Sequence, residues 1–397
     1  MSSTTPIQLY GPQTVPKPTL SPISIQQAQQ QQQQQNHQQQ FIPPSPPATP
    51  QPKQEPTVAA RSLMHHHLHP EFIGKYSLGE ELGSGGFGFV VSATDRCTGV
   101  ERAVKFIFRH KVPSHAWVRD PEIGPVPMEV YVLKHVRHDN IVNFVDFYQD
   151  DTFLYLVMEL HGTQWSSNNN NNHGPVINNN TIETPSSPPH SPALSQASEE
   201  SLMSSPGTPI DEYPPQLYQR RTSCDLFECI ERHHNFNEDL AKKIFRQICE
   251  CIGYLDTLGI CHRDIKDENI VIDDQYRVKL IDFGSAVILP RHDGQQKTCY
   301  FGKFFGTVSF ASPEILMCKP YRAEPAEIWA LGVLLYTILF GEVPFTSPNM
   351  AIAGRFATPK IPVSYKCMHL LTFLLQRNPE KRPSIHQVLT HPWFHEN

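Results

Sequence analysis

Two polar strings that lie close together in the chain constrain its fold more than any other feature. The first string reads His262-Arg263-Asp264-Ile265-Lys266-Asp267-Glu268-Asn269, and the second reads Asp282-Phe283-Gly284. Between them stand two apolar runs, at residues 270–272 and 278–281, whose composition predicts the two strands of a hairpin. Such a hairpin would present both polar strings at one end.

The side chains in these strings suit the transfer of a phosphoryl group. Asp264 is a candidate base and Lys266 a cation, while Asn269 and Asp282 offer hard oxygen ligands of the kind that Mg²⁺ prefers. Catalysis of phosphoryl transfer consists mostly of positioning and of neutralising charge, and this set supplies both. The alternative is a chance scatter of polar residues on a surface, which the complete string argues against.

Length and composition exclude several other classes of protein. The chain has 397 residues, enough for about two or three domains. Its net charge of −6 gives no case for nucleic acid or an anionic membrane as a partner. The nine cysteines follow no disulfide or metal-site spacing, which fits a reducing compartment.

Neither a secretory signal nor a membrane span is predicted. The N-terminus lacks a basic segment followed by an apolar one. The longest uncharged apolar stretch, residues 328–341, is shorter than the roughly 20 residues that a spanning helix needs, so it predicts a buried core helix. We therefore expect a soluble protein of the cytoplasm or nucleus.

Two segments of biased composition divide the chain. Residues 1–70 carry a glutamine tract and a proline cluster, and residues 164–222 carry asparagine runs with repeated Ser-Pro and Thr-Pro pairs. Both have too little apolar content to offset the entropy lost on ordering, so they predict a disordered tail and a disordered insertion. The remaining pieces, 71–163 and 223–397, have the pattern of one domain.

The two remaining pieces differ in secondary structure. Short alternating runs in 71–163 predict strands, interrupted by a helix from Met128 to Val136. Apolar residues at three- and four-residue spacing in 223–397 predict helices. The sequence thus predicts an α+β fold with a small β-rich lobe followed by a larger helical lobe.

The first piece holds a glycine-rich string, Leu82-Gly83-Ser84-Gly85-Gly86-Phe87-Gly88-Phe89-Val90, which contains G-x-G-x-x-G. Alone this is a weak signal. It lies between two strand-like runs, not between a strand and a helix, which favours a flexible hairpin covering phosphates over a dinucleotide-binding fold. Glycine would let backbone amides approach phosphate oxygens closely.

A lysine and a glutamate follow the glycine-rich string. Lys105 lies at the offset of a lysine that grips the α- and β-phosphates, and Glu129 opens the next helix. We expect an ion pair between them that orients the ammonium group. The alternatives are a solvent-facing lysine and an ordinary surface carboxylate.

With these motifs, nearly all of 71–163 and 223–397 resembles a eukaryotic protein-kinase domain. Gly306-Thr307 followed by Ser312-Pro313-Glu314 is similar to the end of an activation segment, with Ser312 where alanine is usual. The resemblance implies a pair between Glu314 and Arg382. Glu327 departs from the family, in which most members have aspartate, and its extra methylene shifts an expected hydrogen bond to the catalytic-loop backbone.

The resemblance implies a two-lobed protein-kinase fold that uses ATP and Mg²⁺, with an N-lobe at 71–158, a hinge at 159–163 and a C-lobe at 223–397. Lys266, two residues past Asp264, is typical of serine/threonine kinases, so the implied partners are protein substrates with serine or threonine acceptors. The implied nucleotide contacts, besides the glycine-rich string and Lys105, are adenine contacts at Val90, Ala103 and Val271, a gatekeeper at Met158, hinge residues from Glu159 to His161, and a ribose contact at Asp225.

Further strings are similar to the catalytic domain of PAS kinases: residues 116–121, 160–162, 264–269, 281–286 and 320–325, together with Glu327. PAS kinases carry sensory PAS domains ahead of the kinase, and residues 1–70 are too few for one. We expect either a chain that lost its sensor or a short relative. Ligand sensing by a PAS domain is not carried over.

Substrate choice and regulation are hypotheses at this level. Glu268 resembles the carboxylate by which basophilic kinases read an upstream arginine, whereas Thr337 stands where strongly arginine-selective kinases often place a second glutamate. A preference for arginine three residues before the acceptor follows as a hypothesis. Arg263 is also a candidate to bind a phosphate on Thr298.

The insertion and a histidine cluster each have two interpretations. The insertion is either an inert segment, because loop-closure entropy grows slowly with length, or a segment whose phosphorylation changes access or recruits partners. The cluster His65-His66-His67-Leu68-His69 is either a metal site or, since no complementary ligand spacing is present, a solvated linker.

Two other functions stay open for the whole chain. One is a pseudokinase scaffold, against which the intact set of catalytic residues argues. The other makes the glutamine- and proline-rich tail the main interaction unit, with kinase activity secondary.

Overall fold

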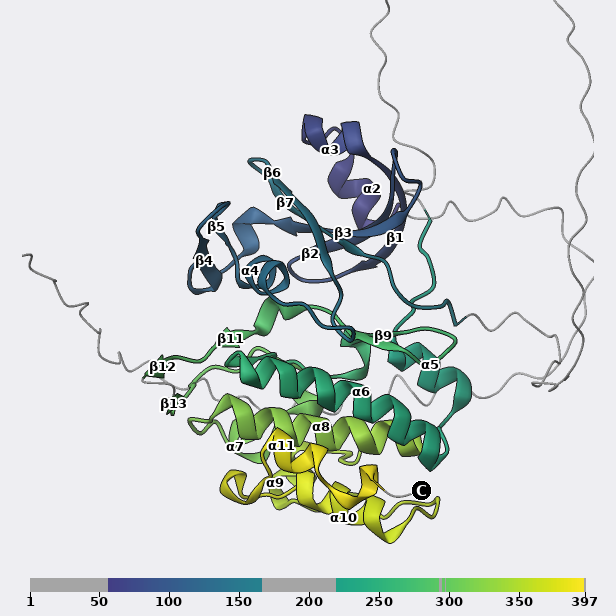
Figure 1. Cartoon of the computed structure of the whole chain (residues 1–397), viewed down its shortest axis with the longest axis vertical. Coiled ribbons are helices and arrows are strands. Elements are labelled where there is room, and N and C mark those ends of the chain that lie inside the picture. Colours follow the sequence, from purple (N-terminus) through teal and green to yellow (C-terminus); the bar gives the residue numbers. More distant parts are fainter. Residues whose placement is uncertain (1–55, 166–218, 293–294, 297, 396–397) are drawn as a thin grey trace, which may run out of the picture. The chain divides into compact units, whose positions relative to one another are not determined.

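A computed structural model of the chain describes residues 56–165, 219–292, 295–296 and 298–395 (Figure 1). The predictions of disorder for residues 1–55 and 166–218 lie outside these described residues. All nine cysteines are free thiols.

An antiparallel sheet of five strands forms the N-terminal lobe. Its order is β1-β2-β3-β7-β6, with bounds β1 (Tyr76–Ser84), β2 (Gly88–Asp95), β3 (Glu101–Phe108), β7 (Phe153–Glu159) and β6 (Phe144–Gln149). The glycine-rich string is the turn between β1 and β2, and Lys105 lies in β3 opposite Val90 of β2. The predicted hairpin over the phosphate site is therefore present.

The two faces of this sheet pack into separate cores. Val104 and Phe106 of β3 are buried in a cluster with α2 (Val58–Leu63) and α3 (Pro70–Lys75). Ala103 and Ile107 belong to the cluster that continues into the helical lobe. Because side chains alternate along a strand, Lys105 falls on the same face as Ala103 and Ile107, toward the helical lobe.

The predicted tail, residues 1–70, is wrong at its C-terminal end. Helix α2 starts after Thr57, whose side chain accepts a hydrogen bond from the Ala60 N–H, and Leu63 is fully buried. Helix α3 brings Phe72, also fully buried, against the sheet. Each helix has six residues, too few to show a helical period in sequence, and both are ordered by tertiary packing.

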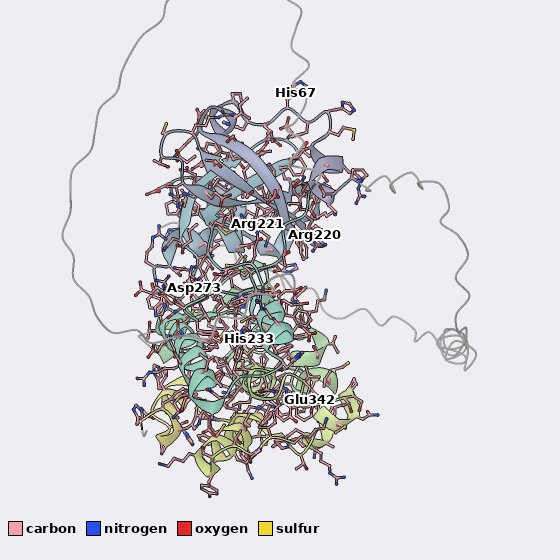
Figure 2. All side chains as sticks on the ribbon, turned by 90° about the vertical axis from the view of Figure 1, so that its right-hand side faces the viewer. His67, Arg220, Arg221, His233, Asp273 and Glu342 are labelled. Atoms are coloured by element: carbon pink, nitrogen blue, oxygen red, sulfur yellow. The ribbon has the colours of Figure 1, made fainter. Side chains whose placement is uncertain are left out.

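The histidine cluster is not a solvated linker throughout. His66 places Nε2 2.9 Å from Oδ2 of Asp150 and packs edge-on against the ring of Phe153. His67 is exposed, near the top of Figure 2. Among the described residues there is no group of three or more His, Cys, Asp or Glu side chains that could hold a metal ion.

A helix and a hairpin stand between β3 and β6. Helix α4 (Met128–His135) confirms the predicted helix, and it follows the hairpin of β4 (Trp117–Asp120) and β5 (Gly124–Pro127). Short 3₁₀ turns, η2 (Arg109–Lys111) and η3 (Ser114–Ala116), connect β3 to this hairpin.

The C-terminal lobe is mostly helical (Figure 1). Its helices are α5 (Leu226–His233), α6 (Glu238–Thr257), α7 (Pro313–Leu316), α8 (Ala323–Phe340), α9 (Pro348–Ala353), α10 (Tyr365–Leu374) and α11 (Ile385–Leu389). Helix α8 is the one helix, in the described part of the chain, that is long and apolar enough to cross a membrane. However, 83% of it is buried inside the protein, as expected of the predicted core helix.

Three short strand pairs accompany these helices in the described part of the lobe. They are β9 (Ile270–Ile272) with β10 (Val278–Leu280), β8 (Ile260–Cys261) with β11 (Val287–Ile288), and β12 (Arg291–His292) with β13 (Gln295–Gln296). The pair β9–β10 confirms the hairpin predicted between the two polar strings. The 3₁₀ turns are η5 (Asp267–Asn269), η6 (Phe283–Ser285), η7 (Val308–Phe310), η8 (Pro379–Lys381) and η9 (Pro392–Phe394).

The predicted insertion, residues 164–222, is too long at both ends. Trp165 is partly buried against the core and contacts the ring of His233. At the other end, Arg220 forms a β-bridge with Glu81 of β1. These contacts are long-range, so composition alone does not reveal them.

Candidate active site

Lys105 lies at the centre of the site, between two carboxylates. Its Nζ is 2.7 and 2.9 Å from the two carboxylate oxygens of Glu129 and 3.0 Å from Oδ1 of Asp282. The predicted ion pair of Lys105 with Glu129 is therefore present, and the second polar string joins it. These contacts join β3, which carries Lys105, to α4, which carries Glu129. They also join it to Asp282, which lies two residues after the end of β10.

Burial and charge act in opposite directions on this group. Burial alone would lower the pKa of Lys105, but the carboxylates of Asp282 and Glu129 raise it above its ordinary value. Burial alone would raise the pKa of Asp282, but Lys105 lowers it below its ordinary value. Both groups therefore stay charged at neutral pH, as binding of a nucleotide phosphate and a cation requires.

Two residues of the site have a backbone conformation, with positive φ, that residues other than glycine rarely adopt. Asp282 has φ of +61° and Arg263 has φ of +66°. The surroundings fix both: the carboxylate of Asp282 accepts a hydrogen bond from the Gly284 N–H at 3.1 Å, and the Arg263 N–H donates to Glu327 at 3.1 Å. Such conformations persist where neighbouring contacts over-determine them, and they cluster at functional sites.

Glu327 of α8 supports the loop that carries the first polar string. Its Oε1 accepts hydrogen bonds from the backbone N–H groups of His262, at 2.8 Å, and Arg263, at 3.1 Å. The hydrogen bond expected despite the extra methylene is therefore present. Burial raises the pKa of Glu327 to about 7.

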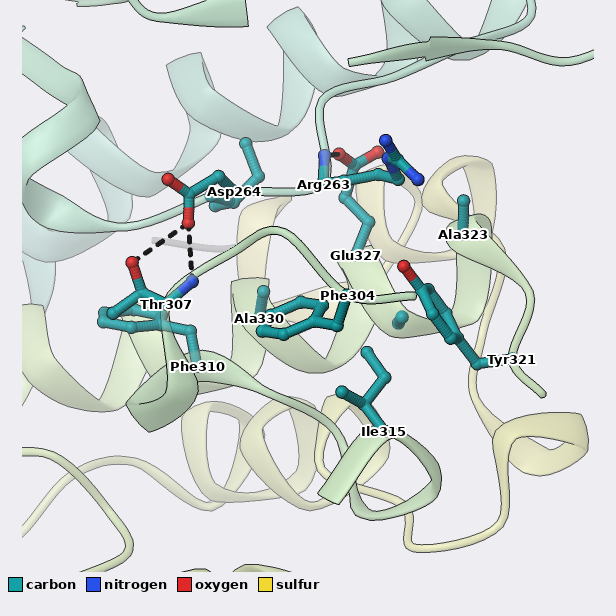
Figure 3. A pocket seen from close by; sticks show the side chains of 12 residues that line it. Arg263, Asp264, Phe304, Thr307, Phe310, Ile315, Tyr321, Ala323, Glu327 and Ala330 are labelled. Carbon is teal, nitrogen blue, oxygen red and sulfur yellow. Dashed lines mark hydrogen bonds between the residues drawn. The ribbon is translucent and has the colours of Figure 1, made fainter. Parts of the chain in front are cut away.

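Asp264 is held on both carboxylate oxygens. Its Oδ1 accepts from the backbone N–H and the hydroxyl of Thr307, at 2.8 and 3.0 Å (Figure 3). Its Oδ2 accepts from Nδ2 of Asn269 at 2.9 Å. Sequence reasoning placed Thr307 in the activation segment but did not assign it to Asp264. The two residues are 43 positions apart in the chain. In the sequence, the pair Gly306-Thr307 was the one signal that could have indicated this contact.

Lys266 binds Glu268 more closely than Asp264. Its Nζ is 2.5 Å from Oε2 of Glu268 and 4.0 Å from Oδ2 of Asp264. The predicted cation is thus at the site. The carboxylate proposed to read an upstream arginine has this lysine as a neighbour.

The predicted adenine and ribose contacts lie on β2, β3, β7 and β9 and at the start of α5. Ala103 pairs with Met158 across β3 and β7, and both are buried. Val271 forms a bridge with Asp225, whose side chain caps α5 by accepting from the Glu228 N–H at 2.9 Å. The adenine and ribose positions inferred from resemblance are therefore contributed by neighbouring elements.

The side chains at the hinge bind other parts of the protein. Oε1 of Glu159 accepts from the Asn143 N–H at 2.7 Å and lies 2.8 Å from Nζ of Lys279. Nε2 of His161 is 3.0 Å from the carbonyl oxygen of Arg277. The side chains of both predicted hinge contacts are thus engaged within the protein.

The family model for the protein kinase domain matches residues 76–183 and 217–394 of this chain. The chain belongs to the protein kinase family. The matched ranges contain the glycine-rich loop, Lys105, Glu129 and both polar strings.

Relatives support the resemblance to PAS kinases. The chain is 35% identical over 323 residues to the PAS domain-containing serine/threonine-protein kinase of Mus musculus, covering 81% of this chain and 19% of that protein. It is 30% identical to serine/threonine-protein kinase PSK1 of Saccharomyces cerevisiae, covering 79% and 19%. It is 28% identical to serine/threonine-protein kinase pim-2 of Danio rerio, covering 82% and 86%. The chain spans about a fifth of the length of the first two of these relatives.

Within this protein kinase domain, Arg263 contacts the activation segment through aromatic rings. Its guanidinium carbon is 5.1 Å from the ring centre of Phe301 and 5.6 Å from that of Phe305, and its Nε donates to the carbonyl oxygen of Ser285. Thr298, the residue considered as its phosphorylated partner, is exposed. The Arg263 side chain thus makes cation–π contacts with two rings and a hydrogen bond to a backbone oxygen.

The end of the activation segment is fixed to the core of the C-lobe. Arg382 donates two hydrogen bonds to the carboxylate of Glu314, each at 2.7 Å, which confirms the pair that the resemblance implied. A cavity of about 20 Å³ lies below Asp264, between Phe310, Ile315 and Ala330 (Figure 3). Its volume suits at most a water molecule, so it is not the nucleotide site.

Proposed function

We propose that the protein transfers the γ-phosphoryl group of ATP to serine and threonine hydroxyls of protein substrates. The observation that carries the proposal is the bridge from Lys105 to both Glu129 and Asp282. It connects the glycine-loop sheet to the second polar string in the arrangement that phosphoryl transfer uses.

In the proposed reaction the hydroxyl oxygen of the substrate bonds to the γ-phosphorus, the bond from that phosphorus to the β–γ bridging oxygen breaks, and ADP leaves. Asp264 orients the hydroxyl and accepts its proton. Lys105 holds the α- and β-phosphates, and Lys266 offsets charge on the transferring group. The backbone of the glycine-rich loop covers the phosphates.

The residues present fit a divalent cation. Asn269 directs its Nδ2 to the backbone oxygen and side chain of Asp264, at 2.8 and 2.9 Å, which leaves its amide oxygen as the acceptor for another partner. The Asp282 carboxylate is half-exposed and ionised. We propose that Asn269 and Asp282 hold Mg²⁺, which neutralises phosphate charge when bound.

We propose that substrates with an arginine three residues before the acceptor are preferred. The Glu268 side chain is 53% exposed, so an arginine can reach it, in competition with Lys266. Thr337 is buried and donates to the carbonyl oxygen of Val333, so it offers no second contact. A peptide array should show a moderate preference that Glu268→Gln removes. An array with no basic preference would contradict the proposal.

The direct test compares the wild type with Asp264→Asn. The wild type should transfer labelled phosphate from ATP to serine and threonine peptides, and the variant should lose at least about 100-fold in rate while still binding a fluorescent ADP analogue. Wild-type protein that binds the analogue but transfers no phosphate to any peptide or to itself would favour the scaffold alternative.

A further inference from the structure

A short segment from the end of the insertion lies along the outer edge of β1. The Glu81 N–H donates to the carbonyl oxygen of Gln219 at 3.0 Å, and the Arg221 N–H donates to the carbonyl oxygen of Glu81 at 2.8 Å. Arg220 thus forms a parallel bridge with Glu81. Figure 2 shows Arg220 and Arg221 where the sheet meets the helices below it. Since β1 is an edge strand, these bonds satisfy backbone groups that the sheet leaves open.

The side chain of the same glutamate binds a second segment. Glu81 is 2% exposed, and its carboxylate accepts a hydrogen bond from the Ala59 N–H at 2.7 Å. Ala59 lies in the first turn of α2 and is itself fully buried. The protein kinase match begins at residue 76, so α2 precedes the part of the chain shared with the family.

Glu81 stands at the start of the glycine-rich loop. The pairing of β1 with β2 shifts register on both sides of Glu81, between Leu78 and Glu81 and again between Glu81 and Gly83. Such irregularities bend a strand and re-aim the residues that follow. Leu82, one of the expected nucleotide contacts, is the next residue and packs against the central core.

Packing does little to hold the loop itself. At Gly83, Gly85 and Gly86 no heavy atom beyond the glycine and its two chain neighbours lies within 4 Å of the position that a Cβ would take. On its β2 side the loop has two backbone bonds: the Gly85 N–H donates to the carbonyl oxygen of Gly88, and the Phe108 N–H donates to the carbonyl oxygen of Phe87. On its β1 side, where the glycines have no packing partner, the direction of the loop depends on how the end of β1 is held.

We propose that Glu81 is a positioning residue for nucleotide binding, because it ties the start of the glycine-rich loop to α2 through its side chain and to residues 219–221 through its backbone. This inference rests on the proposed function and adds to it. It gives the insertion a physical connection to the nucleotide site, since a change that pulls residues 219–221 away from β1 releases the base of the loop.

Two variants remove the two ties separately in the full-length chain. Glu81→Ala removes the acceptor for the Ala59 N–H, and Arg221→Pro removes the N–H that donates to Glu81. Glu81→Gln is the conservative rescue, because its amide oxygen can still accept from Ala59. Arg221→Ala is the matched control: it keeps the backbone N–H and loses the guanidinium group, which is 3.5 Å from Glu101.

Two measurements follow these variants. For Glu81→Ala and Arg221→Pro, the Kd of a fluorescent ADP analogue and the KM for ATP should rise about fivefold, the effect of one lost hydrogen bond, with kcat changed less than twofold. Amide hydrogen exchange should speed up at residues 82–90 but not in α6. Glu81→Gln and Arg221→Ala should stay close to the wild type.

The results separate this inference from the proposed function. Unchanged analogue affinity and unchanged exchange at 82–90 in both Glu81→Ala and Arg221→Pro would overturn the inference, and so would a rise in exchange spread equally over the loop and α6. If the wild type transfers no phosphate while exchange at 82–90 still rises in these variants, Glu81 positions the loop and the kinase proposal fails.

Discussion

Lys105 stays charged although most of its side chain is buried. Its two carboxylate partners, Glu129 and Asp282, offset the loss of hydration and raise its pKa. The same contacts fix the position of the ammonium group between the sheet and the second polar string. A residue in this position contributes both charge and geometry, so its loss has two effects.

We predict that Lys105→Met lowers the rate of phosphate transfer by at least about 100-fold, because the phosphates lose their cation. It also leaves Glu129 and Asp282 without their shared partner, so the melting temperature should fall. Lys111→Met is the control, since Lys111 is exposed in the next turn of the chain. Initial rates with a peptide substrate test this, and a rate within tenfold of the wild type would contradict it.

Glu327 makes stability depend on pH. Burial raises its pKa from 4.5 to about 7, so the folded chain holds this proton more tightly than the unfolded chain. The stabilising contribution is complete below about pH 4.5 and is lost as the pH rises through about 7. The direction is opposite to that of a carboxylate whose pKa is lowered by an ion pair.

We predict that Glu327→Gln reduces this pH dependence, because glutamine keeps an acceptor for the His262 and Arg263 N–H groups without a charge to bury. Between pH 5 and pH 8 the wild type should lose on the order of 2–3 kcal/mol of unfolding free energy that the variant retains. Urea titrations at both pH values measure the difference. Equal losses in the two proteins would refute this assignment.

At the scale of elements, the β4–β5 hairpin supports the helix that carries Glu129. Asp120, at the end of β4, has a fully buried side chain whose Oδ1 accepts from Nζ of Lys134 in α4 at 2.7 Å. The same oxygen accepts from the N–H groups of Glu122 and Ile123, at 2.9 and 3.1 Å. One carboxylate thus closes the hairpin turn and attaches it to α4.

We predict that Asp120→Ala lowers the unfolding free energy by about 2–4 kcal/mol, because it leaves buried donors without an acceptor. Transfer activity should fall as well, since α4 positions Glu129. Glu122→Ala is the matched control: it removes the other partner of Lys134, 2.8 Å away but 77% exposed, and should cost under about 1 kcal/mol. Denaturant titrations compare the two, and similar losses would count against the hairpin's role.

At the scale of the whole molecule, Arg382 connects distant parts of the C-lobe. It binds Glu314 at the end of the activation segment, donates to the carbonyl oxygen of Pro325 at 2.8 Å, and lies over the ring of Trp329 in α8 at 5.2 Å. Its side chain is fully buried. Burial alone would raise the pKa of Glu314, but Arg382 lowers it, so the pair is ionic.

We predict that Arg382→Leu costs about 3–5 kcal/mol, because it leaves the buried Glu314 carboxylate unpaired. Arg322→Leu is the control, since its pair with Glu380 is longer, at 3.1 Å, and exposed, and its loss should cost under about 1 kcal/mol. Thermal melts rank the two variants. A smaller shift for Arg382→Leu than for Arg322→Leu would contradict this account.

The sequence by itself determined the features that depend on residues close together in the chain. The polar strings around Asp264 and Asp282, the glycine-rich loop, the β9–β10 hairpin and the apolar run of α8 are all local patterns, and each was found where the sequence predicted it. The pair of Lys105 with Glu129 was also predictable, since both residues belong to motifs of the family.

Only the tertiary structure decided the contacts between residues far apart in the chain. Helices α2 and α3 lie in a segment predicted to be a disordered tail, and residues 219–222 lie in a segment predicted to be an insertion. Thr307 binds Asp264, and both Ala59 and Arg221 bind Glu81. The two partners of each of these contacts lie far apart in the sequence. The physical reason is that such contacts stabilise the protein only when packing brings their partners together. Composition and periodicity describe short stretches of the chain and therefore do not reveal them.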